Sequence, residues 1–174
     1  LKDSKLKGSI IADSQSSVDL KNSEWNITKD SEVGNLKLDE TVLVFDDVKE
    51  TGEYHTLKAN TMSGSGAIFF NADMSEEKND KVIVEKVDGE LDLKLDIRNI
   101  NSEKEMQYGK DYLFMTISDV ENSRVTVSSF DGKNYIDMGP VRVQIQENKG
   151  DIVVSTPDYF RKETLSDLSN AVVS

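Results

Sequence analysis

An apolar pattern that recurs in the same register in two neighbouring stretches constrains the fold of this chain more than any other feature of its sequence. The two copies align at four positions: Val18 with Leu36, Leu20 with Leu38, Trp25 with Leu43, and Ile27 with Phe45. Each copy contains two pairs of residues spaced by two, and this spacing places both members of a pair on one face of a β-strand. Short strands that stack on their counterparts in the next repeat are typical of a parallel β-solenoid.

The later repeats become longer. We expect the row of Leu36 to continue at Leu57 and then at Val82, and each of these steps is longer than the one before it. The additional residues lie in two polar stretches, Asp46–Glu53 and Ser75–Asp80, where a surface loop can lengthen at small thermodynamic cost. The sequence therefore predicts coils of about 18 to 25 residues with loops at these two places.

The composition favours strands but leaves their arrangement open. Val and Ile are several times as frequent as Ala, the best helix former. An antiparallel sandwich or barrel also has short alternating strands, so two clear copies of the pattern do not exclude it.

After residue 89 the sequence changes to segments that are typical of hairpins. Leu91–Ile97 alternates without a break, and a polar connector, 99–105, separates it from Tyr112–Ile117. Further alternating segments are followed by turns that contain glycine, at Asp131-Gly132 and at Asn148–Gly150. We expect these segments to form antiparallel strands that cover the exposed end of the solenoid.

The last residues predict a short helix. Thr156 can cap it with Pro157 at its first position, and four apolar residues then share one face at helical spacing: Phe160, Leu165, Leu168 and Val172.

The charge and the cysteine count exclude several classes of function. The formal net charge of −12 disfavours nucleic acid and anionic membrane surfaces as partners. The chain has no cysteine, which excludes disulfides, thiolate metal sites and cysteine nucleophiles. No apolar run approaches the length of a membrane helix, and residues 1–11 lack the apolar core of a signal peptide.

Several motifs occur in a recognisable order. A tryptophan, Trp25, opens a coil; Met62–Gly66 gives a turn of the form Leu-x-Gly-x-Gly with Met62 at the leucine position; and Asp80–Val84 gives an Asp-led strand. Tyr135–Val141 and Gly150–Val154 then form a closing pair of segments. In this order and spacing the sequence resembles the pertactin-like C-terminal passenger region of Gram-negative autotransporters, over most of the chain.

The resemblance implies an all-β fold: a right-handed parallel β-helix that ends in antiparallel hairpins and a short C-terminal linker helix. It implies terminal coils over residues 1–60, an autochaperone and capping region over 61–155, and a linker toward an outer-membrane barrel over 156–174. The partners it implies are that barrel and upstream passenger coils in cis, with a host surface receptor contacted by the whole passenger. The implied location is the bacterial cell surface or the extracellular space.

We expect no catalytic, cofactor-binding or metal-binding residues in this segment. The residues expected to matter are structural positions of the core and its turns: Trp25, Ile27, Leu36, Leu38, Leu43, Phe45, Leu57, Gly64, Gly66, Phe69, Val82 and Val84. Gly66 is expected at a turn that needs positive φ.

Three features could carry chemistry but have simpler interpretations. His55, the one histidine, could serve in a Ser-His-Asp relay, although a histidine at the surface or at the edge of a coil is expected instead. Gly64-Ser65-Gly66 lacks the third glycine and the helix of a dinucleotide site, so it predicts a tight turn. The acidic stretch Asp46–Glu53 could bind calcium or assist catalysis on sugars, but charged loops are usually solvated.

Three functional hypotheses follow. The first is a non-catalytic stem and autochaperone that nucleates the extracellular folding of the passenger and supports display of an upstream region. The second is an adhesive surface in which an outward loop such as Asp46–Glu53 contacts a host molecule. The third is a fragment of a glycan-cleaving β-helix.

Overall fold

The structure, a computed structural model, describes residues 1–100 and 107–157 of the chain. Within these residues a four-residue helix, α1 (Val48–Thr51), accompanies twelve strands. The strands are β1 (Lys5–Gly8), β2 (Ser17–Lys21), β3 (Glu24–Ile27), β4 (Ser31–Phe45), β5 (Thr56–Asp73), β6 (Lys78–Asn79), β7 (Lys81–Asn99), β8 (Asp111–Asp119), β9 (Arg124–Ser129), β10 (Tyr135–Met138), β11 (Val141–Asn148) and β12 (Asp151–Ser155).

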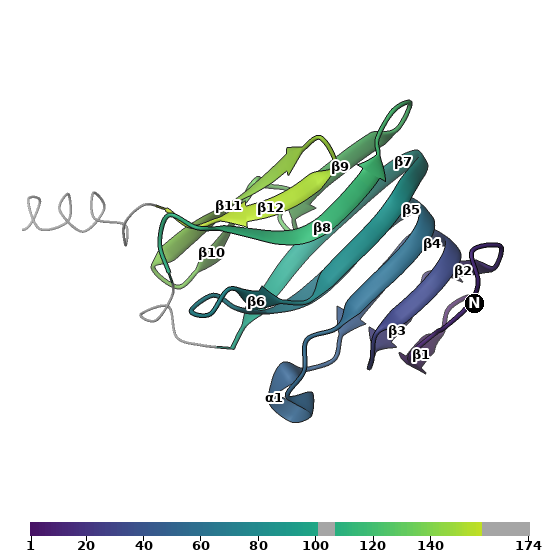
Figure 1. Ribbon diagram of the computed structural model, residues 1–174, viewed down its shortest axis with the longest axis horizontal. Coiled ribbons are helices and arrows are strands. Elements are labelled where there is room, and N and C mark those ends of the chain that lie inside the picture. Colours follow the sequence, from purple (N-terminus) through teal and green to yellow (C-terminus); the bar gives the residue numbers. More distant parts are fainter. Residues whose placement is uncertain (101–106, 158–174) are drawn as a thin grey trace, which may run out of the picture.

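The strands form a parallel β-helix that ends in antiparallel hairpins. The main path of the sheet runs β1-β3-β4-β5-β7-β8-β12-β11-β10. Pairing is parallel from β1 to β8 and antiparallel from β8 through β12 and β11 to β10. Figure 1 shows the coils stacked from the N-terminal end, in purple, toward the green and yellow hairpins.

Each coil has three faces, which the first coils define. The first face contains β2, the second contains β3, and the third begins with residues 31–33 of β4. The long strands β4, β5 and β7 bend through more than one face, so each pairs with several shorter strands. Side chains that point inward form one continuous apolar core from Leu20 to Val154.

The register of the first two repeats is confirmed at all four predicted positions. On the first face Val18 pairs with Leu36 and Leu20 with Leu38. On the second face Trp25 lies beside Leu43, and Ile27 lies beside Phe45.

The predicted step from Leu36 to Leu57 is wrong. Leu36 stacks on Met62 instead, and Leu57 stacks on Ser31 on the third face. Leu57 and Leu36 both lie in strands where inward and outward residues alternate, so the pattern alone does not separate them. The loop that holds α1 is inserted into this coil, and the residue that stacks on Leu36 therefore lies farther along the chain than the predicted one. The next predicted step, from Leu57 to Val82, is confirmed, as is its neighbour from Ala59 to Val84.

The predicted start of the antiparallel region is also wrong. Residues 91–99 belong to β7 and pair in parallel with β5, so they form part of a coil. Residues 115–119 of β8 and residues 124–129 of β9 add further parallel pairing to β7, whereas residues 111–116 of β8 pair antiparallel with β12, as expected. Alternation of apolar and polar residues is the same in both kinds of sheet, and only the stacking partner distinguishes them.

The hairpins that close the sheet agree with the sequence. β11 and β12 pair with Asn148 opposite Asp151, which places the turn at Lys149-Gly150. Gly132 lies in the other predicted turn, where its N–H donates to the carbonyl of Ser129 at 2.9 Å. The predicted domain boundary at residue 60 lies inside β5, and the predicted C-terminal helix lies outside the described residues.

Candidate functional site

The inward side chains of the second face form a stacked column that joins the coils to the hairpins. Trp25 is fully buried and donates its indole N–H to the carbonyl of Gly8 at 3.0 Å. The rings of Phe45 and Phe70 stack at 5.6 Å between centroids, and Phe114 of β8 meets Phe70 edge to face at 5.0 Å. Aromatic pairs of this geometry add to the free energy gained by burial. The column therefore spans three turns of the chain.

The structure places most of the predicted core residues inside. Nine of the ten predicted apolar positions are buried: Trp25, Ile27, Leu36, Leu38, Leu43, Phe45, Leu57, Val82 and Val84. Phe69 differs, because it is half-buried and points outward, while Ile68 and Phe70 on either side occupy the core. The sequence run Ile68-Phe69-Phe70 is apolar throughout, so alternation could not identify the inward residues.

Gly64 and Gly66 are required where β5 lies beside β4 at a shift in their parallel register. Gly64 has φ of +101°, and a Cβ there would lie 1.8 Å from the carbonyl oxygen of Leu38. Gly66 does not have the positive φ that we expected, but its Cβ would lie 2.4 Å from the carbonyl oxygen of Thr41. Close approach of two backbones, rather than the turn alone, explains the second glycine.

A buried carboxylate that the sequence analysis missed lies at the corner before the third face. Asp80 is fully buried, and its carboxylate accepts the backbone N–H of His55 at 2.8 Å and of Asn71 at 2.6 Å. The side-chain amide of Asn71 donates to it at 2.7 Å. Burial raises the pKa of Asp80 above its ordinary value, against the opposing effect of these hydrogen bonds. The sequence feature that could have identified Asp80 is its place at the start of the strand motif Asp80–Val84.

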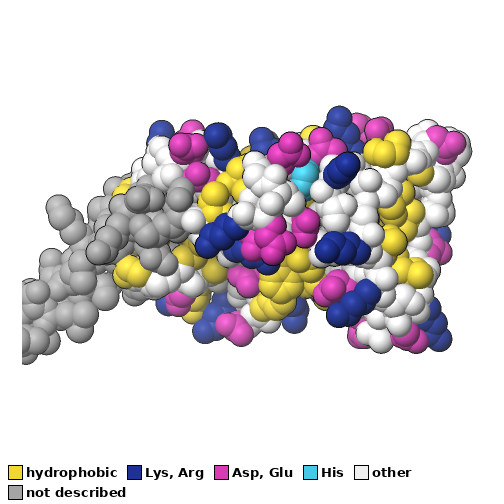
Figure 2. All heavy atoms as spheres, turned by 90° about the horizontal axis from the view of Figure 1, so that it is seen from below, with side chains coloured by type: hydrophobic (Ala, Val, Ile, Leu, Met, Phe, Trp, Pro, Cys, Tyr) yellow, Lys and Arg dark blue, Asp and Glu magenta, His cyan; other side chains and the backbone are white. Residues whose placement is uncertain are grey.

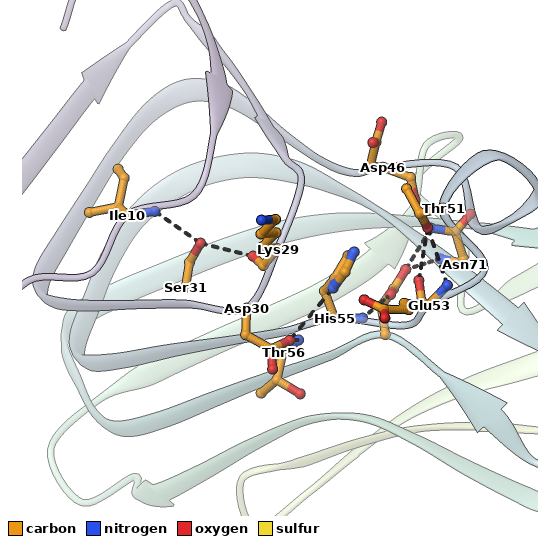
Figure 3. Close-up of polar contacts among 11 residues, drawn as sticks. Ile10, Lys29, Asp30, Ser31, Asp46, Thr51, Glu53, His55, Thr56 and Asn71 are labelled. Carbon is orange, nitrogen blue, oxygen red and sulfur yellow. Dashed lines mark hydrogen bonds and ion pairs between the residues drawn. The ribbon is translucent and has the colours of Figure 1, made fainter.

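Asn71 links this corner to the base of the α1 loop, as Figure 3 shows. Its amide also donates to the carbonyl of Asp46 at 2.7 Å, and its carbonyl accepts from Arg98 at 3.2 Å. Arg98 in turn lies 3.4 Å from the carboxylate of Asp47. Residues from three successive coils are thus joined by one polar network.

His55 is buried at the edge of a coil. Its Nδ1 lies 3.7 Å from the carboxylate of Asp30, and its side chain is 4% exposed. Its Nε2 has no hydrogen-bond partner within the described part of the chain. A Ser-His-Asp relay needs a serine at this nitrogen. Of the two positions expected, the surface and the edge of a coil, the structure places His55 at the edge of a coil with its side chain buried.

The acidic stretch forms a loop that projects from the sheet around α1 (Figure 1). Asp47 caps α1 by accepting the N–H of Lys49 at 3.0 Å, and Gly52 ends it with φ of +74°. Among residues 1–100 and 107–157, no group of three or more acidic or histidine side chains is placed to hold a metal ion.

The two ends of the solenoid differ. At the C-terminal end the hairpins and β8 cover the last coil, and Tyr112 donates its hydroxyl to the carbonyl of Met74 at 2.7 Å. At the N-terminal end the first coil leaves apolar side chains partly uncovered: Leu6, Ile10 and Val18 are half-buried, and Leu1 and Ile11 are exposed. In the described ranges, no helix has the length and apolarity needed to cross a membrane.

Asp80 makes the stability of this corner dependent on pH. Because its pKa is raised in the folded state, the folded chain binds the proton more tightly than the unfolded chain. The contribution of Asp80 to the free energy of unfolding should therefore be fully present below the ordinary aspartate pKa of about 4 and be lost as the pH rises through the raised value.

Urea melts of the wild type and of Asp80→Asn between pH 4 and pH 8 measure this effect. The difference in free energy of unfolding should move in favour of the wild type as the pH falls, by about 1.4 kcal/mol for each pH unit between the two pKa values. An opposite trend would mean that the three hydrogen bonds outweigh burial.

The chain is similar to several known proteins. The profile of the Pertactin family matches residues 33–154. An IgA-specific serine endopeptidase autotransporter of Neisseria gonorrhoeae is 33% identical over 150 residues, which cover 83% of this chain and 9% of that protein. An immunoglobulin A1 protease autotransporter of Haemophilus influenzae is 28% identical over 171 residues, which cover 95% of this chain and 10% of that protein. The chain thus spans about a tenth of these relatives.

The fold also matches a solved structure. The crystal structure of the Haemophilus influenzae Hap adhesin aligns with a TM-score of 0.71 and 22% sequence identity, over 90% of this chain and 16% of that one. This similarity supports the same β-helix architecture.

Proposed function

Because the chain belongs to the Pertactin family and is a passenger region of a type V autotransporter, we propose that it is a non-catalytic stem and autochaperone for that passenger. Its place is the bacterial cell surface or the extracellular space, to which such passengers are exported. In this role the segment folds first outside the cell and serves as the template on which upstream coils fold. Its partners in cis are those coils and the outer-membrane barrel.

The observation that carries the proposal is the difference between the two ends of one continuous core. The C-terminal end is closed by antiparallel strands, whereas the first coil presents half-buried apolar residues and the free edge of β1. A coil added at that edge would pair its backbone with β1 and bury these side chains by nearest-neighbour stacking. The proposal therefore places the upstream coils at this end.

Folding outside the cell requires such a starting point. A chain that emerges from a pore has no external energy source there, so its first coils must fold spontaneously. The polar network of Asp80, Asn71 and Arg98 and the phenylalanine column connect successive coils, and they support the interpretation that the coils and the hairpins fold as a unit.

A display experiment tests the proposal. In bacteria that produce the complete autotransporter containing this chain, Trp25→Ala with Leu43→Ala should leave the barrel inserted but reduce the trypsin-resistant passenger at the surface. Both side chains are fully buried in adjacent coils, and each truncation should cost about 2 to 5 kcal/mol. Wild-type chain supplied separately should partly restore resistance.

The matched control is Lys21→Ala. Lys21 and Asp39 lie on adjacent coils, but both side chains are about 60% exposed and their charged groups are 3.9 Å apart. Such a change usually alters stability by less than about 0.5 kcal/mol, so display should be normal. If the core double variant displays as much resistant passenger as the wild type, the segment is a stem without a folding role.

A second candidate function is an adhesive surface formed by the loop around α1. The loop projects from the body of the solenoid, and its base is held by Asn71 and Arg98. A preorganised loop on a rigid scaffold is a common site of recognition. Saturable binding of a host surface molecule to the isolated chain, lost when residues 46–53 are replaced by a short turn, would favour this function.

A further inference from the structure

The outward side of the second face carries apolar side chains where polar ones are usual. Val42 pairs with Ala67 and Val44 with Phe69 across adjacent strands. Their inward neighbours fill the core, so these four side chains point away from it. Phe130 lies against Phe69 with 4.8 Å between ring centroids and is 42% exposed. We call Val42, Val44, Ala67, Phe69 and Phe130 the apolar stripe.

A groove adjoins the apolar stripe at the bend between the first and second faces. It has a volume of about 250 Å³, and its lining includes Glu40, Val42, Ser65, Ala67, Asp92 and Lys94. A second hollow, which extends to the first coils at residues 3–5 and 22–24, shares Glu40 and Val42 with it. Together they follow the solenoid axis across coils spaced by about 4.8 Å. The small side chains of Ser65 and Ala67, with a glycine between them, leave this space open.

The rim of the groove is acidic. Glu24, Glu40 and Asp92 come from β3, β4 and β7, with β5 between the last two, and none of them forms an ion pair within residues 1–100 and 107–157. Lys94 and Lys5 are the basic side chains of the two hollows. With a net charge of −12 on the chain, the groove attracts cationic groups. Figure 2 shows hydrophobic side chains exposed between charged ones on the underside of the molecule.

We propose that the groove and the apolar stripe bind an extended polypeptide segment of another protein that carries alternating basic and apolar side chains. Basic side chains of the segment lie along Glu24, Glu40 and Asp92, and apolar side chains contact Val42 and Phe69. An extended chain places successive side chains on opposite sides, which suits a surface with an acidic border and an apolar border. The groove at residues 40–42, 65–67 and 92–94 lies away from the edge of β1 that the proposed function uses, whereas the second hollow reaches that edge at Lys5.

Charge argues against a second copy of this chain as the occupant. A complex of two copies would bring together two acidic rims and two chains of net charge −12, and like charges at an interface disfavour association. The aliphatic and phenyl side chains of the stripe also favour an occupant with apolar side chains over a neutral glycan.

The test titrates the full chain with a decapeptide of alternating lysine and leucine and follows the backbone amides by NMR. Saturable shifts should be confined to residues near 22–24, 40–44, 65–69 and 92–96 and to Phe130. Phe130→Ser and Asp92→Asn should each weaken binding by about tenfold. Ile11→Ser and Glu121→Gln, at exposed positions away from the groove, should leave it within about twofold. Emission of the buried Trp25 verifies that every variant is folded.

Two further decapeptides separate the contribution of charge from that of apolar contact. One alternates lysine with serine and the other alternates glutamate with leucine, and each should bind at least about tenfold more weakly than the lysine–leucine peptide. The proposal is overturned if the lysine–serine peptide binds equally well, since attraction by net charge alone then suffices, or if the shifts are spread over the whole acidic surface. It is also overturned if sedimentation shows a dimer that Phe130→Ser dissociates, because the occupant is then a second copy.

Discussion

Replacing Gly64 with valine should prevent the chain from folding. A Cβ at this position would lie 1.8 Å from the carbonyl oxygen of Leu38, and that oxygen belongs to the backbone of an adjacent buried strand. Valine must also adopt φ near +101°, which a β-branched side chain tolerates poorly. The two effects together should exceed about 4 kcal/mol, a large part of the roughly 5 to 15 kcal/mol by which most domains are stable.

Three other substitutions of glycine separate the two causes. Gly89→Ala keeps the demand for positive φ, at +78°, but meets nothing within 4 Å, so it should cost only about 1 to 2 kcal/mol. Gly66→Ala lacks that demand but brings Cβ to 2.4 Å from the carbonyl of Thr41, and it should cost more than Gly89→Ala. Gly64→Ala combines both and should be the worst of the three. Urea melts followed by circular dichroism rank them, and equal losses at Gly64 and Gly89 would show that the close approach to β4 carries no cost.

Removal of residues 112–157 should convert a soluble chain into an aggregating one. This deletion takes away β8 and the hairpins, so that Phe70 loses Phe114 and the inward residues Val82 and Val84 lose their stacking partners Met115 and Ile117. It also exposes the unpaired edge of β7, a template for pairing with other chains. Size-exclusion chromatography and light scattering should detect large assemblies, whereas the wild-type chain should melt in one cooperative transition.

A chain that ends at Pro157 serves as the control for this deletion. It retains every described strand and the pairing of Thr156 with Lys110, whose backbone N–H donates to the threonine hydroxyl at 3.0 Å. We expect its melting transition to match that of the full chain. A soluble, cooperatively folded fragment of residues 1–111 would contradict the role of the hairpins as a cap.

The sequence predicted the stacking of the first coils because their rungs are short and free of long insertions. The pairs Trp25–Leu43 and Leu20–Leu38 could be identified from spacing alone. The prediction failed at Leu57, where the loop around α1 shifts the register, and at Phe69, where three consecutive apolar residues conceal which one points inward. Asp80 and Asn71 are joined by a hydrogen bond across a bend of the chain, and no local sequence pattern predicts that contact.

By itself the sequence determined that strands prevail, which residues of the first two coils point inward, the turn at Gly150 and the need for glycine in the turn at residues 64–66. These follow from side-chain periodicity and backbone sterics, which act over a few residues. Only the tertiary structure decided that residues 91–99 stack in parallel on β5, that Gly66 is required by close approach, and that His55 is buried. Each of these depends on which coil lies next to which, and that order is set by the lengths of the loops together with the free energy of burying the whole core.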